Sequence, residues 1–243
     1  ELASGLEGEG RLAEPEKIVK AVQDYFLDLA TLKGKRILIT AGPTHESIDP
    51  VRFIGNHSSG KMGFALAKVA AERGAFVHLI AGPVVLETPS GVDRENVTSA
   101  REMFEAVKGA FESIDVVIMA AAVADYRVQN PALEKIKKKS SKMELKLEKN
   151  EDILLYLGNN KQHQLLIGFA LETENEIKNA EKKLISKKLD AIVLNSLKNK
   201  GAGFATDTNQ ISILQKDNKL ISFELKHKND VAADVLDVIE KLL

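Results

Sequence analysis

The chain has 243 residues, enough for one large α/β domain or two small ones, and its 44% hydrophobic and 28% charged residues are ordinary for a globular protein. Lys and Arg number 34 against 35 Asp and Glu, so no global charge favours nucleic acid or an anionic membrane. The absence of cysteine excludes disulfides and thiolate chemistry, and without an apolar run of membrane length or a signal-peptide pattern we expect a cytoplasmic protein.

The predicted elements alternate in the order of a doubly wound α/β fold. Residues 1–13 are expected to be loop, and the apolar spacing after Pro15 predicts a linker helix within 14–33. From residue 34 onward, short apolar strands alternate with amphipathic helices, which indicates a Rossmann-like, mainly parallel sheet. The expected strands are 35–40, 75–80, 95–97, 114–122, 165–171 and 190–195, and the expected helices are 59–73, 101–112, 151–158 and 174–188.

Two stretches in the second half of the chain depart from this alternation. The alternating stretch 143–149 is typical of an edge strand. Residues 209–225 predict a C-terminal β-hairpin extension that turns at Asp217 and Asn218, followed by a final helix over 229–243.

The stretch FIGNHSSGKMG (53–63) contains a GxxxxGK sequence like that of a P-loop. A P-loop needs Ser or Thr after the lysine and a strand directly before its glycine turn. Here Met62 follows Lys61, and the preceding strand is expected to end near Thr40. We therefore interpret the match as coincidental and assign Lys61 no role.

The start of the helix after this loop has the features of an anion site. Ser58 or Ser59 is expected to be its N-cap, and Gly60 and Gly63 allow a ligand or another backbone to approach closely. The alternative is that these glycines serve only the packing of helix on strand. The preceding loop, 41–57, is long for a compact α/β unit, which favours a functional segment.

Six motifs follow one another along residues 34–243. They are AGPTHESIDPVRFIGNHSSGKMG (41–63), AAAVADY (120–126), EKIKK (134–138), KNEDIL (149–154), GFALET (168–173) and FATDTNQ (204–210). In this order they resemble the phosphopantothenate–cysteine ligase family, which in bacteria usually forms the C-terminal half of a bifunctional coenzyme A biosynthesis protein. The resemblance implies a ligase domain over 34–243.

The first residues resemble a different part of such proteins. The stretch LASGLEGEGRLAEP (2–15) is similar to the closing segment of the FMN-dependent decarboxylase half, so residues 1–13 are expected to be a remnant of that upstream half. FMN would then belong to the upstream half and not to this chain. The stretch departs from the family pattern at Ser4, where relatives usually carry cysteine, and at Leu12, where they carry Met.

The resemblance implies a two-step reaction with CTP, 4′-phosphopantothenate and L-cysteine, and ATP is the alternative nucleotide. The carboxylate attacks the α-phosphate to form an acyl-cytidylate and pyrophosphate, and the cysteine amine then displaces CMP. Mg²⁺ is expected to arrive with CTP, its protein ligands unknown. A homodimer is also implied, and the 209–225 hairpin is a candidate to extend a sheet across its two-fold axis.

The resemblance also implies roles for particular residues. Asn56 would contact the carboxyl group and stabilise the acyl-cytidylate, and Lys135, on a mobile lid, would neutralise charge on the triphosphate and the forming acyl phosphate. The anion-binding surface would comprise Gly42, Asn56, Ser59, Gly60 and Gly63. The nucleotide site would comprise Ala120, Ala121, Ala122, Asp125, Lys135, Glu151, Asp152, Ile153, Leu154, Phe169, Lys183 and Lys187.

Each of these residues could instead have a purely structural role. Asn56 and Asp125 also suit loop-capping positions, and the lysines also suit a solvated surface. Relatives usually have Pro where this chain has Glu151. Asn195 and Asp207 are possible site or dimer residues without an assignment.

Two rival functions come from other classes. An NAD(P)-binding oxidoreductase fits the order of elements, but the GxGxxG motif is missing and the second strand ends on Leu79, Ile80 and Ala81 without an acidic residue. A non-catalytic module that holds decarboxylase subunits together is the second rival, and the N-terminal segment motivates it.

Overall fold

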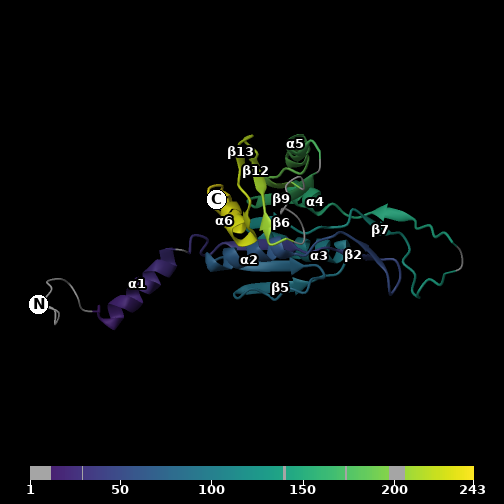
Figure 1. Ribbon diagram of the computed structural model, residues 1–243. Coiled ribbons are helices and arrows are strands. Elements are labelled where there is room, and N and C mark those ends of the chain that lie inside the picture. The colour runs from purple at the N-terminus through teal and green to yellow at the C-terminus, as the bar shows by residue number, and fades with distance from the viewer. Residues whose placement is uncertain (1–11, 29, 139–140, 173, 197–205) are drawn as a thin grey trace, which may run out of the picture.

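The computed structural model of the chain describes residues 12–28, 30–138, 141–172, 174–196 and 206–243. Most of segment 1–13 lies outside this part of the chain. The expected linker helix is α1, Pro15–Asp28, and Figure 1 shows it projecting from the α/β body. No helix in the described residues is both long enough and apolar enough to cross a membrane.

The centre of the fold is an eight-stranded sheet with the order β13-β12-β10-β9-β6-β1-β4-β5. Six strands are parallel: β1 Arg36–Ala41, β4 Phe76–Ala81, β5 Val92–Asn96, β6 Val116–Met119, β9 Leu165–Glu172 and β10 Ala191–Ser196. The hairpin β12 Ile211–Gln215 and β13 Leu220–Ser222 adds two antiparallel strands at one edge, with Asn218 in a left-handed turn. The predicted fold class and hairpin extension are confirmed.

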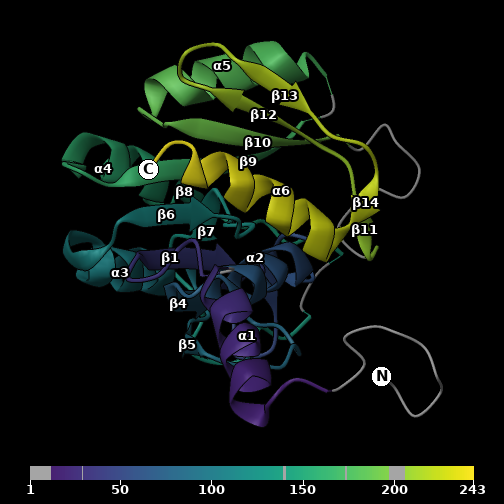
Figure 2. The same ribbon diagram turned by 90° about the vertical axis from the view of Figure 1, so that its left-hand side faces the viewer.

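Helices cover both faces of the sheet, as Figure 2 shows. On one face α2 Lys61–Glu72 and α6 Lys228–Glu240 pack over Ile37 and Ile39. On the other face α3 Ala100–Ala110, α4 Ile153–Asn160 and α5 Glu176–Ser186 pack over Leu38, and a short 3-10 turn, Phe111–Ser113, follows α3. The inner parallel strands are buried on both sides, which explains their nearly continuous apolar sequences, whereas the edge strand β5 has the largely exposed sequence VDREN.

The order of strands places a crevice beside β1. The chain runs from β1 to β4 and β5 on one side, then returns to β6, β9 and β10 on the other. At such a reversal the loops after neighbouring strands diverge, and ligands bind at the carboxyl ends of the strands there.

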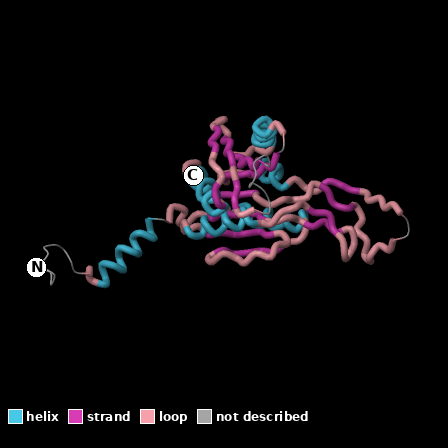
Figure 3. The backbone as a smooth tube through the Cα atoms, viewed as in Figure 1, coloured by secondary structure: helices cyan, strands magenta, loops and turns pink. Residues whose placement is uncertain are grey.

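Three two-stranded ribbons lie outside the main sheet. They pair β2 His45–Ser47 with β3 Phe53–Gly55, β7 Tyr126–Val128 with β8 Leu147–Lys149, and β11 Thr208–Asn209 with β14 Lys226–His227. The expected edge strand 143–149 is therefore confined to β8 and pairs with β7 away from the main sheet. Residues 129–138 and 141–146 extend beyond this ribbon as an arm (Figures 1 and 3).

The predicted N-cap of α2 is wrong. The cap is Gly60, in the left-handed conformation with φ 74°, and no side chain caps the helix. A Cβ atom at Gly60 would lie 3.1 Å from Val84 Cγ1 and 3.5 Å from Gly42 Cα, so glycine is required both for the backbone conformation and for the close approach of two loops. Ser58 instead accepts a hydrogen bond from the Gly60 backbone N–H at 3.3 Å.

Asp190 fastens the sheet near the amino end of β10. Its side chain is buried and accepts hydrogen bonds from Leu166 N at 2.9 Å, Lys161 Nζ at 2.7 Å and Lys216 Nζ at 3.1 Å. Burial opposes ionisation of this carboxyl group, but the lysines and the backbone N–H outweigh it, so the pKa of Asp190 is lowered. The carboxylate therefore links β9, β10 and the β12–β13 turn.

Candidate functional site

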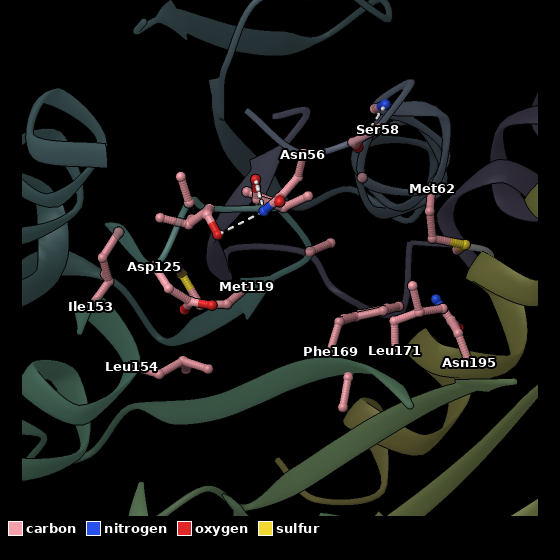
Figure 4. Close-up of a pocket in the computed structure, with 18 of the residues that line it drawn as sticks. Asn56, Ser58, Met62, Met119, Asp125, Ile153, Leu154, Phe169, Leu171 and Asn195 are labelled. Atoms are coloured by element: carbon pink, nitrogen blue, oxygen red, sulfur yellow. Dashed lines mark hydrogen bonds between the residues drawn. The ribbon is translucent and has the colours of Figure 1, made fainter. Parts of the chain in front are cut away.

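A cavity of about 940 Å³ opens at the carboxyl ends of β6, β9 and β10, beside the start of α2 (Figure 4). Its size is within the range of small-molecule and cofactor sites. Nearly all the residues expected to bind nucleotide or substrate line it. They are Asn56, Ser59, Gly60, Gly63, Ala120, Ala121, Ala122, Asp125, Glu151, Asp152, Ile153, Leu154, Phe169, Lys183 and Lys187.

Asn56 follows β3 and points toward the loop after β6 (Figure 4). Its Nδ2 donates hydrogen bonds to the carbonyl oxygens of Val123 at 3.0 Å and Ala122 at 3.3 Å. The side chain is otherwise exposed to the pocket. The amide therefore joins the two loops that form this wall, consistent with the loop-capping alternative, and also presents its polar atoms to the cavity.

Two buried threonines hold the loop after β6 in place. Thr40 Oγ1 accepts a hydrogen bond from Ala121 N at 3.2 Å, and Thr44 Oγ1 accepts one from Ala124 N at 2.9 Å. Both side chains are fully buried. Their contribution was missed in the sequence, because Thr40 looks like an ordinary residue of an apolar strand and Thr44 like an ordinary loop residue.

Gly42 is the one expected glycine that does not line the cavity. It has φ 79°, and its carbonyl accepts a hydrogen bond from Ala122 N at 2.8 Å, so it supports the pocket wall. Gly63 lines the cavity but is also a packing residue, because a Cβ atom there would lie 2.5 Å from Ala41 Cβ. The packing alternative was considered for Gly60 and Gly63, and at Gly63 packing of helix on strand and a place in the cavity wall occur together.

The segment 149–154 forms the end of the pocket beneath α5. Asp152 is the N-cap of α4 and accepts from Leu155 N at 3.0 Å, and Lys187 Nζ donates to the other oxygen of Asp152. Asn150 Nδ2 donates to the Ala124 carbonyl at 2.7 Å, which ties this segment to the loop after β6. Lys183 of α5 and Lys187, the C-cap residue of that helix, both line this end of the cavity.

Glu151 stands where relatives usually have a proline, and an ion pair holds it in place. Its Oε2 accepts from Arg127 Nη1 at 2.9 Å, and Arg127 Nε donates to Glu148 Oε1 at 2.8 Å across the β7–β8 ribbon. A hydrogen bond from the backbone N–H of Glu151 lowers the pKa of its carboxyl group, and the positive charge of Arg127 lowers it further. Glu151 is thus ionised and anchored at the rim.

Lys135 is exposed on the arm and is not among the residues that line the cavity. The neighbouring Ile136 is fixed by Asp49: Asp49 Oδ2 accepts from Ile136 N at 3.0 Å, and Arg52 Nη2 donates to the Ile136 carbonyl at 3.0 Å. The Arg52 guanidinium and three backbone N–H groups hold the pKa of Asp49 well below its usual range, although burial opposes this. Asp49 and Arg52, both missed in the sequence, thus fasten the arm at the residue after Lys135.

Several further residues line the pocket without a role assigned from the sequence, and four of them gather at one end. Lys61 and Lys228 line the end opposite segment 149–154, together with Asn195 and Asn209, whose side chains share a hydrogen bond of 3.1 Å. Lys228 starts α6, far from the motifs in the sequence, and the pairing of β11 with β14 brings it here. In the sequence, Lys61 suggested only a coincidental P-loop and Asn195 was a possible site or dimer residue, whereas Asn209 and Lys228 carried no signal.

Carboxylates that could reach a metal ion are sparse in the cavity. In the described residues no group of three or more His, Asp or Glu side chains is arranged to hold an ion. Three acidic residues line the pocket, and Glu151 and Asp152 are engaged by Arg127 and Lys187.

The fold and the pocket define an α/β protein with a ligand crevice at the point where the strand order reverses, which is where such folds bind nucleotides. The chain matches the family described as "DNA/pantothenate metabolism flavoprotein C-terminal domain" over residues 32–243, and it belongs to that family. The resemblance stated from the motifs is confirmed.

Similar proteins share most of this chain. A relative named "Cysteine/Cysteine sulfinic acid decarboxylase", from an unknown prokaryotic organism, is 52% identical over 100% of this chain and 69% of its own length. The "Coenzyme A biosynthesis bifunctional protein CoaBC" of Bacillus subtilis is 46% identical over 99% of this chain, which spans 60% of that relative. A solved C-terminal domain of a protein of the same name is 44% identical, with a TM-score of 0.76, and covers 88% of this chain and 97% of its own.

Proposed function

We propose that the chain catalyses the CTP-dependent ligation of L-cysteine to 4′-phosphopantothenate, which gives 4′-phosphopantothenoylcysteine, CMP and pyrophosphate, in coenzyme A biosynthesis. One observation carries this proposal: in a member of this family, a single cavity joins Asn56, the alanines 120–122 after β6, and the lysines 183 and 187. The name of the Bacillus subtilis relative and of the solved domain supports it.

The reaction needs alignment of two anionic substrates more than covalent help from the protein. A carboxylate oxygen forms a bond to the α-phosphorus while the bond to the leaving pyrophosphate breaks. The cysteine amine then attacks the acyl carbon, loses a proton, and CMP leaves. A site that holds carboxylate and α-phosphate in contact, with cations where charge develops, supplies most of the required stabilisation.

Asn56 is the proposed contact of the substrate carboxyl group. One of its N–H groups would exchange a backbone carbonyl for a substrate oxygen, and the 3.3 Å bond to Ala122 is the longer of its two contacts. The remaining bond to Val123 would keep the side chain oriented. An amide donates to the developing acyl-cytidylate without adding a charge.

The nucleotide is proposed to lie against the alanines after β6, with its base near Ile153, Leu154 and Phe169. Lys183 and Lys187 would meet the triphosphate, and Lys135 would join them when the arm approaches. Mg²⁺ would be held mainly by phosphate oxygens and water, because two of the three lining carboxylates are already engaged. The ion would neutralise charge on the triphosphate.

The wider assignments remain proposals of the same kind. Residues 1–13 would be the remnant of an upstream FMN-dependent decarboxylase half, residues 14–33 a linker, and residues 34–243 the ligase domain. We also propose a homodimer that acts in the cytoplasm.

The test is product formation by purified protein with 4′-phosphopantothenate, cysteine, Mg²⁺ and each of the four nucleoside triphosphates. We expect 4′-phosphopantothenoylcysteine with CTP, measured by mass spectrometry. Its absence with every nucleotide, at any protein concentration, would refute the proposal and favour the non-catalytic module. Release of CO₂ from cysteine is measured in parallel, because one relative has a decarboxylase name.

A further inference from the structure

Lys61 and Lys228 lie at the end of the pocket that adjoins Gly60 and Gly63 of the expected anion-binding surface, but neither lysine has a role in the reaction as proposed. Figure 4 shows two of its residues, Met62 and Asn195, across the cavity from Ile153. Among the described residues that line this end, the charged side chains are the two lysines, whereas the acidic lining residues belong to the loops at the opposite end. We refer to it as the Lys61–Lys228 end.

Lys228 is unusual for a lysine because it is only 6% exposed. Its ammonium group donates a hydrogen bond to the carbonyl oxygen of Thr206, and its backbone N–H donates to the Asp207 carbonyl at 2.9 Å. Burial lowers the pKa of Lys228, and the charge of Lys61 lowers it further, while Asp207 opposes the change. An anion in the cavity would therefore relieve the cost of keeping two ammonium groups close together at this depth.

Asp207 is the carboxylate that now faces Lys61. Lys61 Nζ lies 2.6 Å from Asp207 Oδ1, and this contact, with smaller contributions from His227 and Lys228, lowers the pKa of Asp207. The Asp207 side chain is 66% exposed and does not line the cavity. It lies on the exposed surface beside Lys61, where turning to solvent would cost it little, because an exposed ion pair is weak.

The backbone beside Lys61 also favours an anion. Lys61 is the first residue of α2, whose N-cap Gly60 provides no side-chain hydrogen bond to the helix. The first N–H groups of a helix lack partners within the helix and carry partial positive charge. Here this helix start borders the same cavity as the two lysines.

We propose that Lys61 and Lys228 bind a phosphoryl group of a substrate, and that Asp207 holds Lys61 until this group replaces it. The inference rests on the proposed function, which supplies two phosphorylated ligands, the nucleoside triphosphate and the 4′-phospho acid. A phosphoryl group suits the site because its several oxygens accept from both ammonium groups and from the helix N–H groups at once. The substrate carboxylate is already assigned to Asn56.

Isothermal titration calorimetry tests the site with two ligand pairs, CTP against cytidine and 4′-phosphopantothenate against pantothenate. The variants are Lys61→Gln, Lys228→Gln and Asp207→Asn. Lys68→Gln is the matched control, because Lys68 lies on the same helix, is exposed and pairs only weakly with Glu72 at 3.9 Å. The phosphorylated and unphosphorylated member of each pair are titrated into every variant.

We expect each lysine variant to weaken one phosphorylated ligand about tenfold or more, while its unphosphorylated partner and the Lys68→Gln protein stay unchanged. The pair that responds identifies the source of the phosphoryl group. Asp207→Asn should act in the opposite direction and tighten the same ligand, because it removes the competing carboxylate. General damage to the pocket would weaken binding in all three variants.

The proposal is overturned if wild-type protein binds either phosphorylated ligand and neither lysine variant changes that affinity. If wild-type protein binds none of the ligands, the proposed function itself fails, which separates the two outcomes. Circular dichroism checks the fold of Lys228→Gln. If that variant unfolds, the Lys61→Gln variant decides the question, because the Lys61 side chain is partly exposed.

Discussion

Gly63 couples the stability of the fold to the shape of the pocket, and Gly63→Ala is the sharpest test of this packing. The new Cβ atom would lie 2.5 Å from Ala41 Cβ and 3.1 Å from Thr40 O, whereas carbon atoms normally pack at about 3.5–4.0 Å. Helix α2 would have to move about 1 Å away from β1. Overpacking of this kind costs about 1–3 kcal/mol, and the higher helix propensity of alanine returns up to about 1 kcal/mol.

We therefore expect Gly63→Ala to lower the free energy of unfolding by about 1–2 kcal/mol, measured by urea denaturation. Gly109→Ala is the matched control, because Gly109 also lies in a helix, α3, but a Cβ atom there meets nothing within 4 Å. This control should gain about 0.5–1 kcal/mol. A Gly63→Ala protein as stable as the wild type, or a loss of the same size in both variants, would refute the reasoning.

Three further predictions concern charge and hydrogen bonding. The folded-state pKa of Asp190 is lowered, so its contribution to stability should be present above about pH 4 and fade as the pH falls further. In a plot of unfolding free energy against pH, Asp190→Asn should therefore reduce the loss of stability at acidic pH. Lys187→Gln should weaken CTP binding in calorimetry more than cytidine binding, since the ammonium that now pairs with Asp152 would no longer meet a phosphate; equal effects on both would contradict the role. Asn56→Asp should nearly abolish acyl-cytidylate formation while CTP still binds, because a carboxylate would face the Ala122 and Val123 carbonyls and repel the substrate carboxylate; normal turnover would exclude the assigned contact.

The alternation of elements was predictable because the inner parallel strands are buried on both faces and have short apolar sequences. The strand expected at 190–195, for example, is β10, Ala191–Ser196. The edge strand β5, Val92–Asn96, is largely exposed and charged, and the strand expected at 95–97 overlaps it only in part. Most nucleotide-site residues expected from the motifs also meet in one cavity, since they follow neighbouring strands whose carboxyl ends share an edge.

The features that sequence reasoning missed depend on contacts between distant segments. Gly60 replaces a serine as the N-cap because its backbone must pass close to Gly42, a constraint that local capping preferences do not contain. Lys228 reaches the pocket only because β14 pairs with β11, and the stretch around it looks like an ordinary polar helix start. The ribbon of β7 and β8 likewise required a pairing across an 18-residue gap between Val128 and Leu147.

The central claim is that one pocket activates the carboxylate of 4′-phosphopantothenate with CTP. The most direct measurement is pyrophosphate release from CTP in the absence of cysteine, with the protein in excess over nucleotide. The account predicts one pyrophosphate per CTP only when 4′-phosphopantothenate is present, together with an acyl-cytidylate that cysteine converts to product. Pyrophosphate release that is independent of 4′-phosphopantothenate, or no release with any nucleoside triphosphate, would contradict it.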